Sequence, residues 1–107
     1  MAGAKIIVIY PRPTDVTTFE KLYVEDHVPM VPKFTGITKF VQTKVVGTPT
    51  GETPQFHRFA ELHFPSMETL QRAASSKEAQ QAVAHAVSIS TGGSPIFLVC
   101  EESITNF

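Results

Sequence analysis

The sequence has a single cysteine, little charge and no long hydrophobic run. Because Cys100 stands alone, the chain forms no intrachain disulfide and offers no zinc site built from several cysteines. Nine lysines and arginines stand against ten acidic residues, and no run of like charge is longer than Glu101-Glu102. Binding to a polyanion needs concentrated positive charge, so nucleic acid is excluded as an expected partner.

The sequence also lacks the features of a membrane anchor or a secretion signal. The first apolar run, from Ile6 to Tyr10, is far shorter than the ~20 residues of a membrane helix, and no small-residue cleavage site accompanies it. We therefore expect a cytoplasmic protein with no membrane partner. With 107 residues, 42% of them hydrophobic, the chain is expected to form one globular domain over residues 1–107.

Four stretches have the β-branched runs or the alternation typical of strands. They are residues 5–10, 38–46, 56–64 and 96–100. Between the first two, a helix is expected to begin at Thr17, which has Glu20 at capping-box spacing, or at the alternative N-cap Asp15. Two prolines follow Val28, so the helix is expected to end near that residue.

A second helical segment is expected between the last two strands. It begins at Ser66 and is broken near Ser75-Ser76, because Ser75 and Glu78 have the spacing of a new capping box. The resulting order, β-α-β-β-α-β, predicts a ferredoxin-like α+β fold in which an antiparallel four-stranded sheet carries two helices on one face.

The first and last predicted strands are apolar on both faces. In the first, Ile6 and Val8 alternate with Ile7 and Ile9. Two helices cover only one face of such a sheet, and no further segment of the chain is left to cover the other. We therefore predict a homodimer in which two sheets pack together as a closed barrel.

Two stretches of the sequence carry a family resemblance. They are Tyr10-Pro11-Arg12-Pro13-Thr14-Asp15, continued by Phe19-x-x-x-Tyr23-x-x-x-His27-x-Pro29, and the run from Ala60 to Leu70. Through them nearly the whole chain resembles the EthD family, named for bacterial degradation of ethyl tert-butyl ether. The resemblance implies a dimeric α+β barrel; related barrels include isomerases, polyketide-type cyclases, cofactor-less monooxygenases and haem-binding enzymes. Arg12 and Thr35-Gly36 depart from the common family pattern.

The main candidates for chemistry lie in a row on the first helix. Phe19, Tyr23 and His27 recur every four residues and share one helix face. His27 is expected in the last turn, where the helix dipole favours the imidazolium; there it either exchanges a proton with a substrate or caps the last carbonyls. Tyr23 is expected to orient a substrate oxygen, with a purely structural hydrogen bond as the alternative. Phe19 and Tyr10 are expected to contact substrate or to fill the core.

The third predicted strand offers a second group of candidates. Its alternation divides it into two faces: His57, Phe59, Glu61 and His63 on one, and Arg58, Ala60, Leu62 and Phe64 on the other. Because the second set suits packing against helices, Glu61 and His63 are expected to point into the intersubunit barrel beside Gln42. There they would contact substrate, form an acid–base pair or half of a metal site, or form an interface network. No metal and no cofactor is assigned.

Two further residues of reactive type receive no catalytic role. His85 follows Gln81 on the polar side of the second helical segment, so we expect it to be exposed to solvent. Cys100 ends a buried strand without a histidine beside it in sequence, so we expect it to act as a small hydrophobic residue.

Two functions from different classes fit these residues. In the first, the protein binds a small, mostly apolar carbonyl, lactone or aromatic compound, and His27 transfers a proton during isomerisation, cyclisation or oxidation. In the second, the protein is a non-catalytic dimeric accessory or carrier of an oxygenase system. An apolar cleft of roughly 300 Å³ or more, reached by His27, favours the first function. Haem binding is a third hypothesis, although no axial ligand is assigned.

Overall fold

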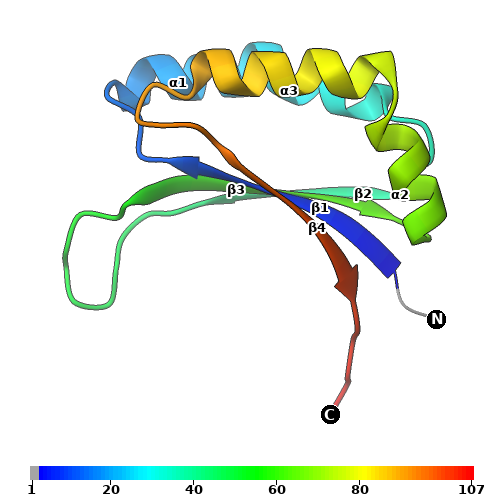
Figure 1. Ribbon diagram of the computed structural model, residues 1–107. Coiled ribbons are helices and arrows are strands. Elements are labelled where there is room, and N and C mark those ends of the chain that lie inside the picture. Colours follow the sequence, from blue (N-terminus) through cyan, green and yellow to red (C-terminus); the bar gives the residue numbers. More distant parts are fainter. Residues whose placement is uncertain (1–2) are drawn as a thin grey trace.

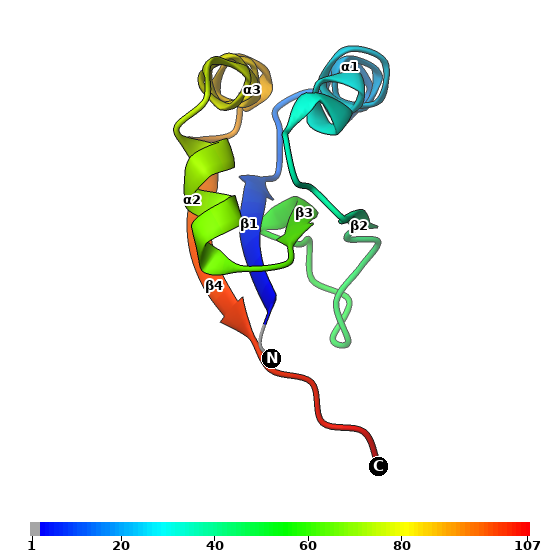
Figure 2. The same cartoon turned by 90° about the vertical axis from the view of Figure 1, so that its right-hand side faces the viewer.

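The computed structural model describes residues 3–107 and contains one antiparallel four-stranded sheet with helices on one face (Figure 1). The elements follow in the order β1 (Gly3–Pro11), α1 (Val16–Leu22), η1 (Tyr23–His27), η2 (Val28–Lys33), β2 (Lys39–Lys44), β3 (Phe56–Phe64), α2 (Met67–Ala74), α3 (Lys77–Ile89) and β4 (Ile96–Glu102). The predicted ferredoxin-like fold is confirmed. Seen end-on, α1 and α3 lie side by side above the sheet (Figure 2).

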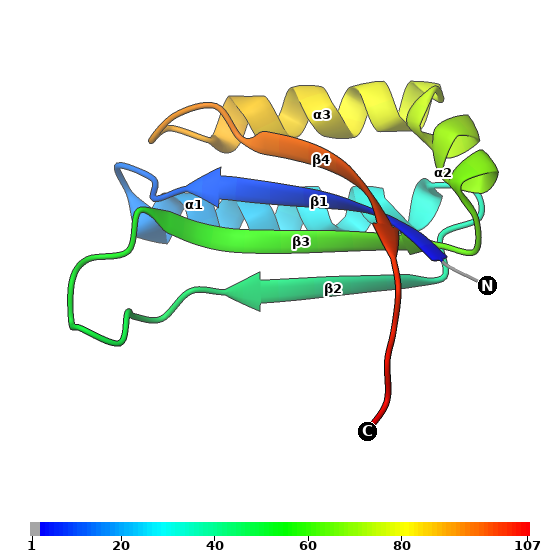
Figure 3. The same ribbon diagram turned by 60° about the horizontal axis from the view of Figure 1, so that its bottom comes forward.

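The strands lie in the order β2-β3-β1-β4, so the first and third strands form the middle of the sheet (Figure 3). The predicted bounds of β3 are confirmed. The observed β1 and β4 extend beyond their predicted ends, while β2 is shorter than predicted. Every neighbouring pair is antiparallel.

The first helical segment is longer than predicted, and its end near Val28 is wrong. After α1 the chain continues as the π-helix η1 and then as the 3-10 helix η2, which ends at Lys33. Pro29 is tolerated because it stands in the first turn of η2, where a missing backbone N–H breaks no helical hydrogen bond.

The start of this segment is capped by Asp15, the alternative to Thr17. The carboxylate of Asp15 accepts hydrogen bonds from the backbone N–H of Thr18 at 3.2 Å and from its hydroxyl at 2.7 Å. The capping box of Thr17 and Glu20 does not form, because Glu20 binds side chains of β3 instead.

The second helical segment is broken where the sequence indicated. Ser66 caps α2 by accepting a hydrogen bond from the backbone N–H of Thr69. At the break, Ser75 ends α2, and Ser76 caps α3 by accepting from the N–H of Ala79. The predicted N-cap Ser75 is therefore one residue too early.

The hydrophobic core fills the space between the sheet and the helices. Tyr10, Tyr23, Phe19 and Leu70 are its largest fully buried side chains. Alternation along β1 directs Val8 and Tyr10 toward the helices. The core therefore carries two tyrosines whose hydroxyls need partners away from water.

The face of the sheet opposite the helices, called the outer face here, carries apolar residues, including Ile7, Ile9, Phe59 and Leu98. Leu98 is 43% exposed although it is a large apolar side chain. The terminal residues after β4 run away from the helices, on the outer-face side (Figure 1). Among residues 3–107, no helix combines the length and apolar character needed to cross a bilayer.

Candidate active site

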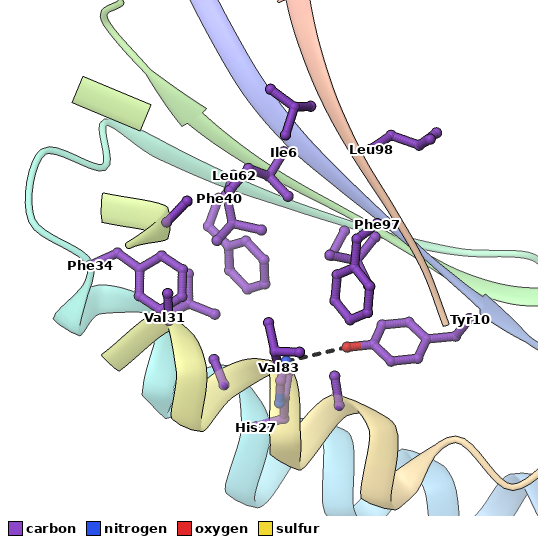
Figure 4. Close-up of a pocket in the computed structure, with 17 residues that line it drawn as sticks. Ile6, Tyr10, His27, Val31, Phe34, Phe40, Leu62, Val83, Phe97 and Leu98 are labelled. Atoms are coloured by element: carbon purple, nitrogen blue, oxygen red, sulfur yellow. Dashed lines mark hydrogen bonds between the residues drawn. The ribbon is translucent and has the colours of Figure 1, made fainter. Parts of the chain in front are cut away.

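An apolar cavity of about 190 Å³ lies between the sheet and the helices (Figure 4). Its walls come from all four strands, from η1, η2, α2 and α3, and from Phe34 after η2. The larger apolar side chains are Ile6, Val31, Phe34, Phe40, Leu62, Val83 and Phe97. Tyr10 and His27 supply the polar side chains among the 17 residues drawn around it. The cavity therefore resembles a binding site that holds an apolar body and offers hydrogen bonds at one place. Its volume is below the roughly 300 Å³ that was expected to favour the first function, so this size criterion is not met and only small ligands fit.

The two polar groups of this helix–sheet cavity contact each other. The Tyr10 hydroxyl lies 3.2 Å from Nε2 of His27 (Figure 4). Tyr10 is placed by the helix-facing alternation of β1, and His27 by the wide turn of η1. Both are buried: Tyr10 is 0% exposed and His27 is 7% exposed. The structure thus brings together one residue predicted to transfer protons and one predicted to contact substrate.

His85 completes the environment of His27, and its predicted exposure to solvent is wrong. The Nδ1 atoms of the two histidines lie 2.9 Å apart, and their rings are parallel within 10°. His85 precedes Ala86 and follows Ala82 by three residues, and both alanines face the core. It therefore lies at the edge of the buried side of α3, where the sequence pattern alone places a polar residue in solvent.

The expected imidazolium at position 27 is also wrong. Burial, with a smaller contribution from His85, lowers the pKa of His27 to about 4. Because the helical segment continues to Lys33, His27 does not meet the free carbonyls of a helix end. Near neutral pH, His27 is therefore an uncharged imidazole with one N–H donor and one acceptor nitrogen.

Tyr23 and Phe19 lie behind His27 and do not line the cavity. The rings of Phe19 and Tyr23 are stacked at 5.6 Å between centroids, and those of Tyr23 and His27 at 5.8 Å. The Tyr23 hydroxyl is buried without a hydrogen-bond partner in the described chain, and burial raises the pKa of Tyr23 to about 12. Both residues hold the ring of His27 in place. The predicted contact of Tyr23 with a substrate oxygen and the predicted contact of Phe19 with substrate stay predictions, which this geometry does not favour.

His57 is on the opposite face from the one predicted. Pro11 pairs with Phe56 and Tyr10 pairs with Arg58, so the register shifts by one residue and His57 is the extra residue of a bulge. Both His57 and Arg58 consequently reach the helices.

These two side chains meet Glu20 of α1. The Glu20 carboxylate accepts a hydrogen bond from Nη2 of Arg58 at 2.7 Å and lies 3.0 Å from Nε2 of His57. The Arg58 guanidinium is the main cause of a lowered pKa of Glu20, about 2. The same guanidinium lies 4.9 Å from the centre of the Tyr23 ring. This Glu20 network fixes α1 on the sheet and supports the stack behind His27.

Glu61 and His63 lie on the outer face, separated from the cavity by the sheet. Gln42, predicted to stand beside them, faces the helices instead, because it pairs with Ala60, and Val41 pairs with Glu61. Nε2 of His63 lies 3.5 Å from the Glu61 carboxylate.

Lys5 and Glu102 complete this group, called the outer-face cluster here. The Lys5 ammonium donates to Glu61 at 2.8 Å and to Glu102 at 2.9 Å. Ligand atoms of Glu61, His63 and Glu102 lie within 4.8 Å of one another, a spacing compatible with a metal ion. The ammonium already neutralises and binds both carboxylates, which is the arrangement of a polar network in an interface.

Several cavity residues were not predicted from the sequence. Phe40 lies in β2 and Phe97 in β4, where side chains alternate between the two faces of the sheet. Both residues can be identified once the face that carries the helices is known. Val31 and Phe34 lie beyond Val28, where the first helical segment was expected to end. The only sequence signal for His85 is its position beside the alanine face of α3.

The chain matches a family model described as the EthD domain over residues 11–87. An EthD family protein from Bacillus halodurans has a TM-score of 0.87 and 28% identity, over 94% of this chain and 99% of that chain. An EthD-like protein from Ralstonia eutropha has a TM-score of 0.71 and 18% identity, over 94% and 91%. A dimeric ferredoxin-like protein of unknown function from a Jannaschia species has a TM-score of 0.66 and 14% identity, over 95% and 100%. No curated protein gives a significant match.

Proposed function

Because this chain belongs to the EthD family, we propose that it binds a small, mostly apolar carbonyl, lactone or aromatic compound in the helix–sheet cavity and exchanges a proton with it through His27. The observation that carries the proposal is the pair formed by Tyr10 and His27. These two side chains are the polar groups of an otherwise apolar wall, and they contact each other at 3.2 Å. An apolar ligand with one oxygen matches this distribution of surfaces.

The pair is suited to proton transfer at or next to a carbonyl group. His27 is neutral near pH 7, so it accepts a proton from a carbon or oxygen acid without first losing one. Burial raises the pKa of Tyr10, which keeps its hydroxyl protonated and able to donate a hydrogen bond to a ligand oxygen. Tyr10 therefore takes the orienting role that the sequence assigned to Tyr23.

The proton step is common to isomerisation and cyclisation. In an isomerisation, a proton leaves one atom of the ligand through the pair of Tyr10 and His27 and a proton returns at another atom, which leaves the enzyme unchanged. Oxidation additionally requires molecular oxygen as a co-reactant. We place the activity in bacterial catabolism in the cytoplasm, as the degradation of ethyl tert-butyl ether suggests for the family.

We also propose that the active form is a homodimer joined through the outer face. Ile7, Ile9 and Phe59 lie on this face with the 43%-exposed Leu98. Contiguous apolar surface of this kind is favourable to cover. A second copy covers it with matching residues, and the Jannaschia protein is described as dimeric.

Binding of phthalide, a five-membered lactone fused to one benzene ring, tests the function. Addition of phthalide to ¹⁵N-labelled protein is expected to shift amide signals of residues around the cavity. Tyr10→Phe should weaken binding by about tenfold, the equivalent of about one hydrogen bond. Glu61→Gln, a change on the far side of the sheet, is the control and should leave the affinity unchanged.

The outcomes separate the two functions. Proton exchange between solvent and bound phthalide-type compounds, lost in His27→Phe, supports the enzyme. Binding without any chemical change across a panel of one-ring carbonyl compounds assigns the accessory or carrier role instead. Shifts confined to the outer-face cluster, or no binding of any compound, would overturn the proposed site.

A further inference from the structure

His85 connects the cavity wall with the molecular surface. Its Nδ1 lies 2.9 Å from Nδ1 of His27, and Nε2 of His27 lies 3.2 Å from the Tyr10 hydroxyl. His27 is buried, whereas His85 is only half-buried on α3. The three side chains thus form a continuous hydrogen-bonded path from the cavity to solvent.

We propose that this path carries protons between a cavity ligand and water, with His85 as its outer end. The inference rests on the proposed function, because it supplies the protons that His27 and Tyr10 exchange. His85 does not line the cavity, so it is a positioning and relay residue and makes no contact with substrate.

The contact between two Nδ1 atoms restricts the positions of the protons. A neutral imidazole has one N–H donor and one acceptor nitrogen. When both rings are neutral, one of them is therefore protonated at Nδ1 and the other at Nε2. Since burial and His85 keep the pKa of His27 at about 4, the neutral form of His27 dominates near pH 7.

Two arrangements satisfy this restriction. In the outward arrangement, Tyr10 donates its O–H to Nε2 of His27, His27 donates its Nδ1–H to His85, and His85 keeps its proton on Nε2. In the inward arrangement, His85 donates its Nδ1–H to His27, His27 donates its Nε2–H to the Tyr10 oxygen, and the Tyr10 O–H is free for the ligand.

Transfer of one proton converts the inward arrangement into the outward one. Tyr10 gives its proton to the ligand, and its oxygen takes the Nε2 proton of His27. Nδ1 of His27 takes the proton of His85, and Nε2 of His85 takes one proton from solvent. One proton enters, one reaches the ligand, and all three side chains remain neutral. The reverse sequence removes a proton from a ligand.

Parallel packing preserves the geometry of the path. The rings of His27 and His85 are within 10° of parallel at 5.1 Å between centroids, and Tyr23 also stacks on His27. The His27 ring is therefore held by two neighbours and does not need to rotate when a proton passes.

The exchange of the His27 ring N–H with water tests the path in the ligand-free protein. His85→Phe keeps an aromatic ring beside His27 but has no nitrogen, and it should slow this exchange by at least about tenfold. His85→Gln keeps a polar group that cannot pass a proton, so it should also slow the exchange of the His27 ring N–H. This second variant tests the path if the phenylalanine variant does not fold. Val87→Phe adds a ring to the exposed side of the same helix and should have no effect.

The position of the ring protons gives a second readout. In ¹⁵N spectra of the wild type, one of the two histidines should be protonated at Nδ1 and the other at Nε2. Exchange at the wild-type rate in folded His85→Phe and His85→Gln would overturn the relay, as would two histidines both protonated at Nε2.

Failure of the relay and failure of the proposed function are distinguishable. Slow exchange in the His85 variants without any phthalide binding would retain the proton path and overturn the function of the cavity. Phthalide binding that depends on Tyr10, with unchanged exchange, would retain the cavity and overturn the path.

Discussion

The hydroxyl of Tyr10 lies 3.2 Å from Nε2 of His27 and joins the end of β1 to η1 across the core. Both residues are nearly inaccessible to solvent, so neither polar group has bulk water as a substitute partner. The same contact that presents two polar groups to the cavity therefore also contributes to the stability of the fold.

The stability of this pair is testable with a double-mutant cycle. His27→Phe and Tyr10→Phe should each cost about 1–3 kcal/mol, because each leaves the other polar group buried without this partner. The double variant should cost clearly less than the sum, with a coupling energy of about 1 kcal/mol, measured by urea unfolding. Phe19→Ala, a change from a large to a small core side chain, is the reference at ~3–5 kcal/mol. Strict additivity of the two changes would contradict the hydrogen bond.

The lowered pKa of His27 predicts how stability depends on pH. The ordinary value of 6.5 applies to the unfolded chain, and burial lowers the value in the folded protein to about 4. Between these values the unfolded state binds more protons, so the stabilisation is complete above pH 6.5 and is lost as the pH falls through 4. Unfolding measured from pH 7 to pH 4 should show this loss. His27→Phe should lack it, and an NMR titration midpoint of His27 near its ordinary value would contradict the prediction.

The Glu20 network predicts a second loss of stability in more acidic solution. The hydrogen bonds from Arg58 to the Glu20 carboxylate lower the pKa of Glu20 from 4.5 to about 2. A carboxylate with a lowered pKa contributes stability that is present above 4.5 and lost as the pH falls through 2. Glu20→Gln should therefore be less stable than the wild type at pH 7 and should lose less stability on acidification. Glu68→Gln, which removes an exposed pair with Arg72, should behave like the wild type.

The outer face predicts the state of association. Leu98→Lys places a charge on this face and should convert the homodimer to a monomer in sedimentation at low micromolar concentration. Val87→Lys introduces the same charge at a residue of α3 that is 49% exposed, and it should remain dimeric. A wild-type protein that sediments as a monomer in dilute buffer would contradict the proposed dimer.

The sequence predicted the order of the elements because local patterns determine it. The alternation in β3 gave its bounds, and Ser66 gave the start of α2. The end of the first helical segment was predicted wrongly because of its prolines. A proline can stand in the first turn of a 3-10 helix or can end a helix, and the sequence does not distinguish these two cases. Local rules therefore describe the elements better than their ends.

The site was predicted only in part, because it depends on contacts between distant segments. His27 and Tyr10 were identified as candidates from the sequence, but their mutual contact joins β1 to η1. The bulge at His57 turns this side chain to the other face of the sheet. The regular alternation of a strand, on which the prediction depended, does not reveal a bulge. The sequence analysis did not identify His85 as a site residue. Its contact partner, His27, is 58 residues away in the sequence, and local patterns do not show contacts between such distant residues.

A crystal structure of the protein soaked with phthalide tests the central claim most directly. We predict that the aromatic ring occupies the helix–sheet cavity against Phe40 and Phe97, with the carbonyl oxygen within hydrogen-bonding distance of the Tyr10 hydroxyl or Nε2 of His27. Tyr10→Phe crystals soaked in the same way should show weaker density for the ligand. An empty cavity at saturating phthalide, or a ligand bound only at the outer-face cluster, would contradict a binding site between the helices and the sheet.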